Sequence, residues 1–200
     1  AILHLLYSRF FVKALKNKKE TEFNFTEPFL GLFTQGMVCH ETYKDQKNNW
    51  LSPEEIFSED GKNFYKKLDQ SEKVTVGPSE SMSKSKKNTI DPEEIIKEYG
   101  ADATRLFILS DSPPEKDVQW SDSGIAAAYK FVQKFWLLHN KIINNNKKFT
   151  SFNNELEEFT NQIINQINLN LEKFRYNVLI ANFHEIYNFL NKTLSKEDWG

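Results

Sequence analysis

The sequence has 200 residues, 39% of them hydrophobic and 27% charged, a composition typical of a folded globular protein rather than a fibrous or disordered one. The formal net charge is -2, so no overall positive field attracts nucleic acid and any RNA contact must depend on local clusters of cations. The single cysteine, Cys39, excludes an internal disulfide and a cysteine-cluster metal site, and no apolar run reaches the roughly 18 residues of a membrane span. We therefore expect a cytoplasmic protein of one or two domains without a membrane segment.

The first 16 residues have helical periodicity. At about 100° per residue, Leu3, Leu6 and Phe10 fall on one face and the basic side chains on the other, which predicts a helix packed on a core. His4 lies beside the apolar face, so its imidazole is predicted to point inward. The chain begins inside this apolar run without a methionine or a capping residue, and we expect it to be part of a longer protein.

Residues 29–43 are rich in apolar and β-branched side chains and predict a strand whose core is residues 32–38. Short apolar runs then flank the dipeptide Asp60-Gly61, which suits a tight hairpin turn because both positions tolerate positive φ. The pattern predicts a small β insertion at about residues 50–76.

Residues 77–88 are small, polar and cationic and predict a mobile loop. A helix start follows, in which Asp91 caps the first turn and Pro92 occupies a position that needs no amide donor. This helix is predicted to run to Tyr99 and a second helical stretch to cover residues 101–109. Consecutive prolines then end it and favour a domain boundary nearby.

Three amphipathic patterns occupy the rest of the chain. The first predicts a helix over residues 122–143, and the others centre on residues 156–167 and 178–190, with a break near 175–177. Residues 144–148 are predicted to form a loop. Consecutive amphipathic helices joined by short links predict a helical bundle.

The chemistry of the loop depends on its position. On its own, the segment of serines and lysines from Ser81 to Lys87 would be an ordinary solvated loop. Because it comes directly before a capped helix start, however, it places ammonium groups and backbone amides together, the combination that binds phosphate. A triphosphate is therefore a candidate ligand.

The stretch Met82-Ser83-Lys84-Ser85 resembles the Lys-Met-Ser-Lys-Ser signature loop of class I aminoacyl-tRNA synthetases and agrees with it at four of five positions. The segments that follow it resemble those of the leucine, isoleucine and valine enzymes, and other stretches are similar to leucyl-tRNA synthetases in particular. The former are residues 86–92 and 99–106, and the latter are residues 1–11, residues 32–38, and residues 112–117 with Trp120. Arg175-Tyr176-Asn177 resembles the start of a helix in the anticodon-binding bundle.

This resemblance implies an α/β plus all-α fold. Residues 1–110 would be the C-terminal part of a Rossmann-like catalytic domain, and residues 111–200 a stem-contact segment and the start of the anticodon-binding bundle. The parent reaction would form leucyl-adenylate from leucine and ATP, assisted by Mg²⁺, and transfer leucine to tRNA(Leu). We expect a monomer, and we expect these residues alone to be inactive because the family's His-Ile-Gly-His element is absent.

The resemblance also implies roles for individual residues. Lys84 would be the catalytic lysine that neutralises the β- and γ-phosphates, with Ser83 and Ser85 supplying hydroxyls and flexibility. Met82 would contact adenine or act as a hydrophobic plug that holds the loop down. The remaining expected ATP-binding residues are His4 and Gln35, on the adenosine side of the pocket, and Gly36, which would let the backbone approach the nucleotide or would simply be a turn glycine. No residue is predicted to bind a metal.

One position departs from the family pattern. Ser81 stands where the family has its first signature lysine, and Lys86 or Lys87 can partly replace that cation. Two alternative functions stay open: an isoleucyl- or valyl-tRNA synthetase, and a non-catalytic RNA-binding module that keeps a synthetase-like scaffold. Asp102 and Arg105 are expected to form an ion pair on a helix surface.

Overall fold

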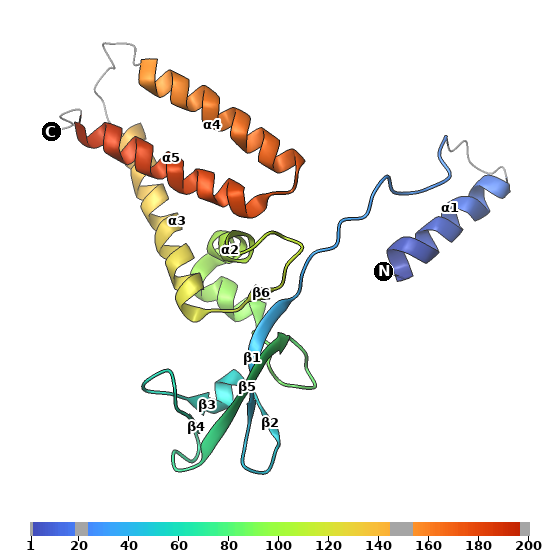
Figure 1. Ribbon diagram of the computed structural model, residues 1–200, viewed down its shortest axis with the longest axis vertical. Coiled ribbons are helices and arrows are strands. Elements are labelled where there is room, and N and C mark those ends of the chain that lie inside the picture. Colours follow the sequence, from blue (N-terminus) through green and yellow to red (C-terminus); the bar gives the residue numbers. More distant parts are fainter. Residues whose placement is uncertain (1, 19–23, 145–153, 197–200) are drawn as a thin grey trace. The chain divides into compact units, whose positions relative to one another are not determined.

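The computed structural model describes residues 2–18, 24–144 and 154–196, and the chain divides into two compact units, Ala1–Thr34 and Gln35–Gly200. Figure 1 labels the helices and strands along the sequence.

The first unit contains one continuous helical segment, the π-helix η1 (Ile2–Tyr7) followed by α1 (Ser8–Asn17), so the helix predicted here is confirmed. Its predicted burial is not found, because Leu3, Leu6 and Phe10 are 67%, 59% and 72% exposed. Among the described residues of this unit, no core therefore covers these three side chains.

The inward orientation predicted for His4 is wrong in this unit, where its side chain is exposed. Residues 24–34 contain no helix or strand, and the only ring contact that the described part of the unit gives His4 is Phe29, with 6.5 Å between centroids. Glu27 binds the helix by accepting from Arg9 Nε at 2.6 Å and from Lys13 Nζ at 3.0 Å. Hydrogen bonding to Arg9 and then to Lys13 lowers the pKa of Glu27 to about 2.

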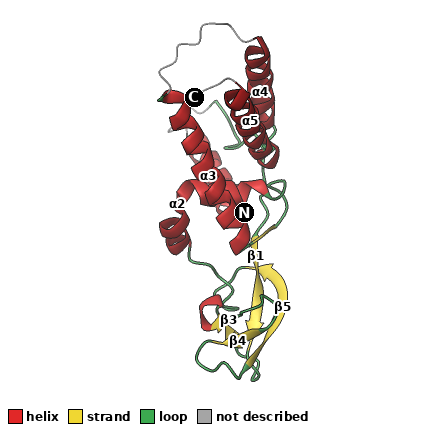
Figure 2. Ribbon diagram, turned by 90° about the vertical axis from the view of Figure 1, so that its left-hand side faces the viewer, coloured by secondary structure: helices red, strands yellow, loops and turns green. Residues whose placement is uncertain are grey.

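The second unit contains a six-stranded sheet, and Figure 2 shows the strands gathered at one end of the unit and the helices towards the other. The strands are β1 (Val38–Lys44), β2 (Trp50–Leu51), β3 (Ile56–Phe57), β4 (Phe64–Lys66), β5 (Lys73–Ser81) and β6 (Val118–Gln119). Their order is β2-β1-β5-β4-β3, with β6 paired to β1. Every described pair is antiparallel except β1 with β6. A sheet combined with helices is confirmed, and most of this sheet is antiparallel.

The strand predicted with its core at residues 32–38 begins only at Val38, so the prediction is wrong for most of that core. The backbone before it bonds elsewhere: Gly36 N–H donates to Pro114 O at 2.8 Å, and Met37 N–H donates to Asp117 Oδ1 at 2.8 Å. Since a turn takes up these amides, no neighbouring strand can form a ladder with them.

The loop predicted over residues 77–88 begins later than expected, because β5 continues to Ser81. The register of β5 against β1 shifts near Gly77, which lies opposite Thr42. Pro78 follows directly. Because the ladder is already irregular here, the missing amide donor of the proline does not cost a regular hydrogen bond. The carbonyl of Pro78 accepts from Thr42 Oγ1 at 3.1 Å. A glycine and a proline that would interrupt a regular strand are therefore accommodated at an irregularity within β5.

The predicted hairpin lies between β3 and β4. The Asp60 carboxylate accepts from the backbone N–H of Lys62 at 2.9 Å and of Asn63 at 2.7 Å, while Gly61 has a φ of +67°. Beneath this region the buried side chains of Tyr43, Leu51, Ile56 and Val74 form a small core with Phe64 against it. A 3-10 turn, η2 (Pro53–Glu55), joins β2 to β3.

The helices are α2 (Pro92–Ser110), α3 (Asp122–Ile143), α4 (Asn154–Glu172) and α5 (Tyr176–Lys196), and all match predicted positions. Asp91 caps α2 by accepting from Glu93 N–H at 2.9 Å, as predicted. Gly100, with φ 83° and ψ 157°, interrupts α2 between the two predicted helical stretches. Most of the loop predicted over residues 144–148 lies outside the described residues.

α2 packs against α3 and α5, and α4 pairs with α5, the orange and red helices of Figure 1. The predicted bundle therefore also includes α2. Its centre contains Ala103, Phe107, Ile125 and Ala128, all buried. None of the described helices is both long enough and apolar enough to be a membrane span.

Candidate functional site

The loop that carries the predicted catalytic lysine leaves the sheet where β1 begins. Cys39 in β1 lies opposite Ser81, the last residue of β5, and Met82 N–H donates to Val38 O at 3.1 Å. The chain then makes a compact turn over residues 84–87 before it reaches the cap of α2 at Asp91. The first residue of the loop is thus tied to the sheet.

Asn88 ties the far end of the loop to the sheet. Its side chain is fully buried, with 0% of its surface exposed. Asn88 Oδ1 accepts from Ser83 N–H at 2.9 Å, and Asn88 Nδ2 donates to His40 O at 3.2 Å and to Glu80 O at 3.1 Å. One amide therefore joins the loop to both β1 and β5.

The three lysines of the loop are in different environments. Lys86 Nζ forms an ion pair with the Glu80 carboxylate, and Lys87 Nζ lies 3.3 Å from Glu55 Oε2. Lys84 is exposed, and no carboxylate among the residues that the structure describes lies within ion-pair distance of it. Lys84 is the cation of the loop that can accept an anionic ligand without first breaking an ion pair.

The partner of Lys87 is itself held in place. Glu55 Oε2 accepts from Ser52 N–H at 2.8 Å, which completes a capping box around η2. This backbone hydrogen bond, followed by the interaction with Lys87, lowers the pKa of Glu55. The carboxylate is therefore ionised at neutral pH and continues to bind Lys87.

Internal contacts shape the tip of the loop. Ser83 Oγ lies 3.3 Å from Ser85 Oγ and accepts from Lys86 N–H at 3.4 Å, while Lys87 N–H donates to Lys84 O at 3.3 Å. Lys87 has a φ of +54°, in the left-handed region. The tip is therefore a defined turn in which the predicted hydroxyl residues Ser83 and Ser85 face one another.

A groove of about 670 Å³ lies beside the loop. Its lining includes Lys84 and Lys87 together with the carboxylates of Glu54 and Asp91. Because acidic and basic groups are balanced in it, the groove is less favourable for a polyphosphate than the exposed tip at Lys84.

Gly36 has a clear packing role. A Cβ at this position would lie 2.0 Å from Lys116 O, so the backbone of Gly36 packs directly against the backbone of the turn at residues 113–117. This favours the alternative of a turn glycine, and nucleotide contact at Gly36 stays a prediction. Gln35, next to it, is exposed.

Three stretches that resemble the synthetase family meet at this point of the fold. Val118 N–H donates to Met37 O at 2.9 Å, and Trp120 N–H donates to Cys39 O at 2.8 Å. The segment after the prolines thus pairs with the start of β1, to which the loop is also bonded through Met82. Residues 36–40, 82–88 and 113–120 are brought together although long segments separate them in the chain.

The other predicted site residues have mixed outcomes. Met82 is half-buried and bonded to the sheet through its backbone, whereas His4 belongs to the first unit and is described only within it. The Asp102–Arg105 ion pair is present on the exposed surface of α2, as predicted. Asn88 was not predicted as a site residue. In the sequence it follows two lysines and precedes the cap of α2, and this polar context does not indicate a fully buried side chain.

Lys86 and Lys87 do not readily replace the lysine missing at position 81. Ser81 is exposed at the end of β5, and each of the two lysines is already paired with a carboxylate. Either would have to exchange its partner before it could bind a phosphate.

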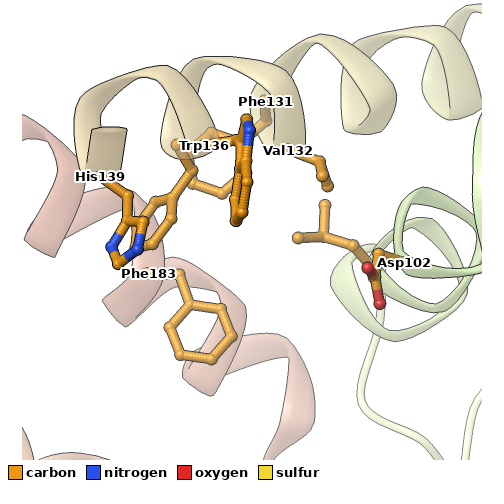
Figure 3. A pocket seen from close by; sticks show the side chains of 8 residues that line it. Asp102, Phe131, Val132, Trp136, His139 and Phe183 are labelled. Atoms are coloured by element: carbon orange, nitrogen blue, oxygen red, sulfur yellow. The ribbon is translucent and has the colours of Figure 1, made fainter. Parts of the chain in front are cut away.

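The helical part of the second unit contains an apolar pocket of about 370 Å³ (Figure 3). Aromatic rings from α3 and α5 dominate its lining, including Phe131, Trp136 and Phe183, and Asp102 of α2 lies at one side. Trp136 stacks on His139 with 5.6 Å between centroids and is 62% exposed. Within residues 2–18, 24–144 and 154–196, no group of three or more His, Cys, Asp or Glu side chains could hold a metal ion.

Comparisons with known proteins agree with the sequence resemblance. The family described as tRNA synthetases class I (I, L, M and V) matches residues 41–121. The chain is 46% identical to a leucine–tRNA ligase of Bartonella henselae and 45% identical to one of Rickettsia canadensis, and each match covers 98% of this chain but 23% of the relative. The chain therefore spans less than a quarter of the length of these relatives.

A solved structure is also similar to this chain. It is the LeuRS of Agrobacterium radiobacter K84, crystallised as a ternary complex with tRNA and LeuAMS. The TM-score is 0.63 at 26% sequence identity, and the match covers 97% of this chain and 22% of that one.

Proposed function

Because the chain belongs to the class I tRNA synthetases, we propose that it forms part of the site that activates leucine with ATP. The relatives reported above are leucine–tRNA ligases. The reaction joins leucine and ATP to give leucyl-adenylate and pyrophosphate, and leucine then passes to tRNA(Leu). Residues 1–110, with strands β1 to β5 and helix α2, would be the C-terminal part of the Rossmann-like catalytic domain. The protein would act as a cytoplasmic monomer.

The observation that carries this proposal is the state of Lys84. An exposed ammonium group without a carboxylate partner among the described residues stands at the tip of a loop whose base is bonded to the sheet. Such a group can meet a polyphosphate and move a short distance with it, while the base of the loop keeps its position.

The chemistry requires a cation at this point. An oxygen of the leucine carboxylate attacks the α-phosphorus of ATP, and the bond from that phosphorus to the bridging oxygen breaks. Negative charge then develops on the departing pyrophosphate. A preorganised ammonium group placed beside the β- and γ-phosphates stabilises that charge more in the transition state than in the ground state, and so lowers the barrier.

We propose supporting roles for the residues around Lys84. Ser83 and Ser85 would present hydroxyls to the phosphates, and Met82 would contact the adenine side of the nucleotide. Gln35 lies just before β1, the strand to which the loop is bonded, and with Gly36 would line the adenosine part of the pocket. For His4, a role toward adenosine rests on the family resemblance alone.

The resemblance implies that magnesium accompanies ATP, and the described residues include no group of three or more His, Cys, Asp or Glu side chains that could hold a metal ion. Mg²⁺ commonly keeps several waters and binds through substrate phosphates. The helices α3 to α5 would contact tRNA(Leu), with the break before α5 at the start of the anticodon-binding bundle.

Amino-acid-dependent exchange of pyrophosphate into ATP tests this function, measured on the protein at the full length that its gene encodes. We expect leucine to support exchange, and isoleucine and valine to support it much less. Faster exchange with isoleucine or valine would assign the protein to one of those rival specificities. No exchange with any of the three, combined with retained tRNA binding, would favour the non-catalytic RNA-binding module.

A further inference from the structure

We propose that Asn88 is the positioning residue of the loop. Its buried amide holds the base of the loop against the sheet, so that only the segment with Lys84 moves. This inference rests on the proposed function of Lys84 for its catalytic consequence. The structural part, that Asn88 anchors the loop, is independent of that function.

The hydrogen bonds of Asn88 have the geometry that an anchor requires. An asparagine amide offers two donors and one acceptor oxygen, and here both ends are used on three backbone groups. The oxygen binds the N–H of Ser83, the residue directly before Lys84, while the nitrogen binds carbonyls of His40 in β1 and Glu80 in β5. Asn88 thus fixes the loop to two strands at once.

Burial separates this anchor from the other contacts of the loop. Asn88 is fully buried, so water cannot replace a lost partner, and these bonds persist as long as the sheet is folded. The ion pairs of Lys86 with Glu80 and of Lys87 with Glu55 are half-exposed and weaker, and an incoming polyphosphate can compete for both lysines. The hydrogen bonds of Asn88 therefore restrain the loop permanently, whereas a ligand can release the two ion pairs.

The location of the anchor determines what can move. Ser83 is held by Asn88, and Met82 is held by Val38, so the segment free to move is residues 84–87. A segment this short has few alternative conformations, which keeps the ammonium of Lys84 close to one working position. Loss of the anchor would let Lys84 sample many unproductive positions.

Three variants of the protein at its full encoded length test the proposal. Asn88→Ala removes all three hydrogen bonds, and Asn88→Ser is a milder change in case the alanine variant does not fold. Asn63→Ala is the matched control, because Asn63 also binds a neighbour, Asp60 Oδ2 at 2.7 Å, but lies in the β3–β4 hairpin outside the loop. Amide hydrogen exchange at Ser83 reports on the anchor, and leucine-dependent pyrophosphate exchange reports on Lys84.

We expect Asn88→Ala to speed hydrogen exchange at the Ser83 amide by about tenfold or more, the ratio that corresponds to one lost buried hydrogen bond. We expect kcat for pyrophosphate exchange to fall by about 10- to 100-fold with the KM for leucine little changed, because only the placement of Lys84 is lost. For Asn88→Ser, both readouts should lie between those of the wild type and of Asn88→Ala. Asn63→Ala should leave both readouts at wild-type values.

Unchanged protection of Ser83 in both Asn88 variants would overturn the anchor. The proposal would also be overturned if Asn63→Ala, at a similar loss of melting temperature, lowered kcat as much as Asn88→Ala does, because the fall would then reflect a general loss of stability. If the wild-type protein shows no leucine-dependent exchange, the proposed function fails, whereas the hydrogen-exchange result still decides whether Asn88 holds the loop.

Discussion

Single residues in this chain differ sharply in what surrounds them, even where the sequence makes them look alike. Lys84, Lys86 and Lys87 lie within four positions, but two are paired with carboxylates and one is exposed without such a partner among the described residues. The difference comes from Glu80 and Glu55, which reach the loop from β5 and from η2. Sequence alone could identify the cluster of cations but not which of them is available.

Gly36 allows a prediction at this scale. Gly36→Ala would place a methyl group 2.0 Å from Lys116 O, so the turn must shift, and we expect the free energy of unfolding to fall by about 1–3 kcal/mol. Gly31→Ala is the control, because no atom lies within 4 Å of its added Cβ, and it should change stability by less than about 0.5 kcal/mol. Urea unfolding measures both, and equal stability of the two variants would contradict the packing role.

His184 allows a second prediction, about pH. The residue as a whole is exposed, but its ring lies 3.8 Å from that of Phe131, between centroids, and this partial burial lowers the pKa of the imidazole below its usual value. The unfolded chain therefore binds more protons than the folded one as pH falls below about 6.5, and we expect a small decrease in the stability of the helical part in that range, since solvent screens an exposed ring. Above that pH both states carry a neutral imidazole and the effect vanishes.

The measurement compares the wild-type protein with His184→Gln, which cannot titrate. Thermal unfolding between pH 7.5 and pH 5.5 should show a steeper loss of Tm for the wild type than for the variant. Parallel curves would mean that His184 does not contribute to the pH dependence.

At the scale of elements, the helices followed local rules that the sequence displays. The cap at Asp91, the proline after it and the apolar periodicity of α3, α4 and α5 each depend on nearby residues, and all were predicted. Strand boundaries were less predictable. The amides before Val38 bond to a turn about 80 residues away, and β5 continues through Gly77-Pro78 because of an irregularity opposite Thr42.

The kink in α2 gives a prediction at this scale. Gly100 has φ 83° and ψ 157°, a conformation open almost only to glycine, although no atom lies within 4 Å of an added Cβ. Gly100→Ala should therefore destabilise the protein by about 1–3 kcal/mol in chemical unfolding through backbone strain alone. If α2 were one continuous helix, the same substitution would stabilise it by up to about 1 kcal/mol, so the sign of the change decides.

At the scale of the whole molecule, the family could be inferred from short motifs, but the arrangement of the site could not. The loop, the start of β1 and the segment at residues 113–120 all carried resemblances, and their hydrogen bonds bring them together. The anchor at Asn88 was missed because burial of a polar side chain depends on strands distant in sequence. The roles of His4 and Gln35 stay predictions.

Under the proposed function, Lys84 supplies the mobile cation for adenylate formation. The most direct test is leucine-dependent pyrophosphate exchange by Lys84→Ala, with Lys62→Ala as the control, since Lys62 is an exposed lysine of the β3–β4 hairpin. We predict that Lys84→Ala lowers kcat by about 10² to 10³, as for the loss of one preorganised donor, and that Lys62→Ala retains the wild-type rate. A wild-type rate in Lys84→Ala, or an equal loss in both variants, would contradict the claim.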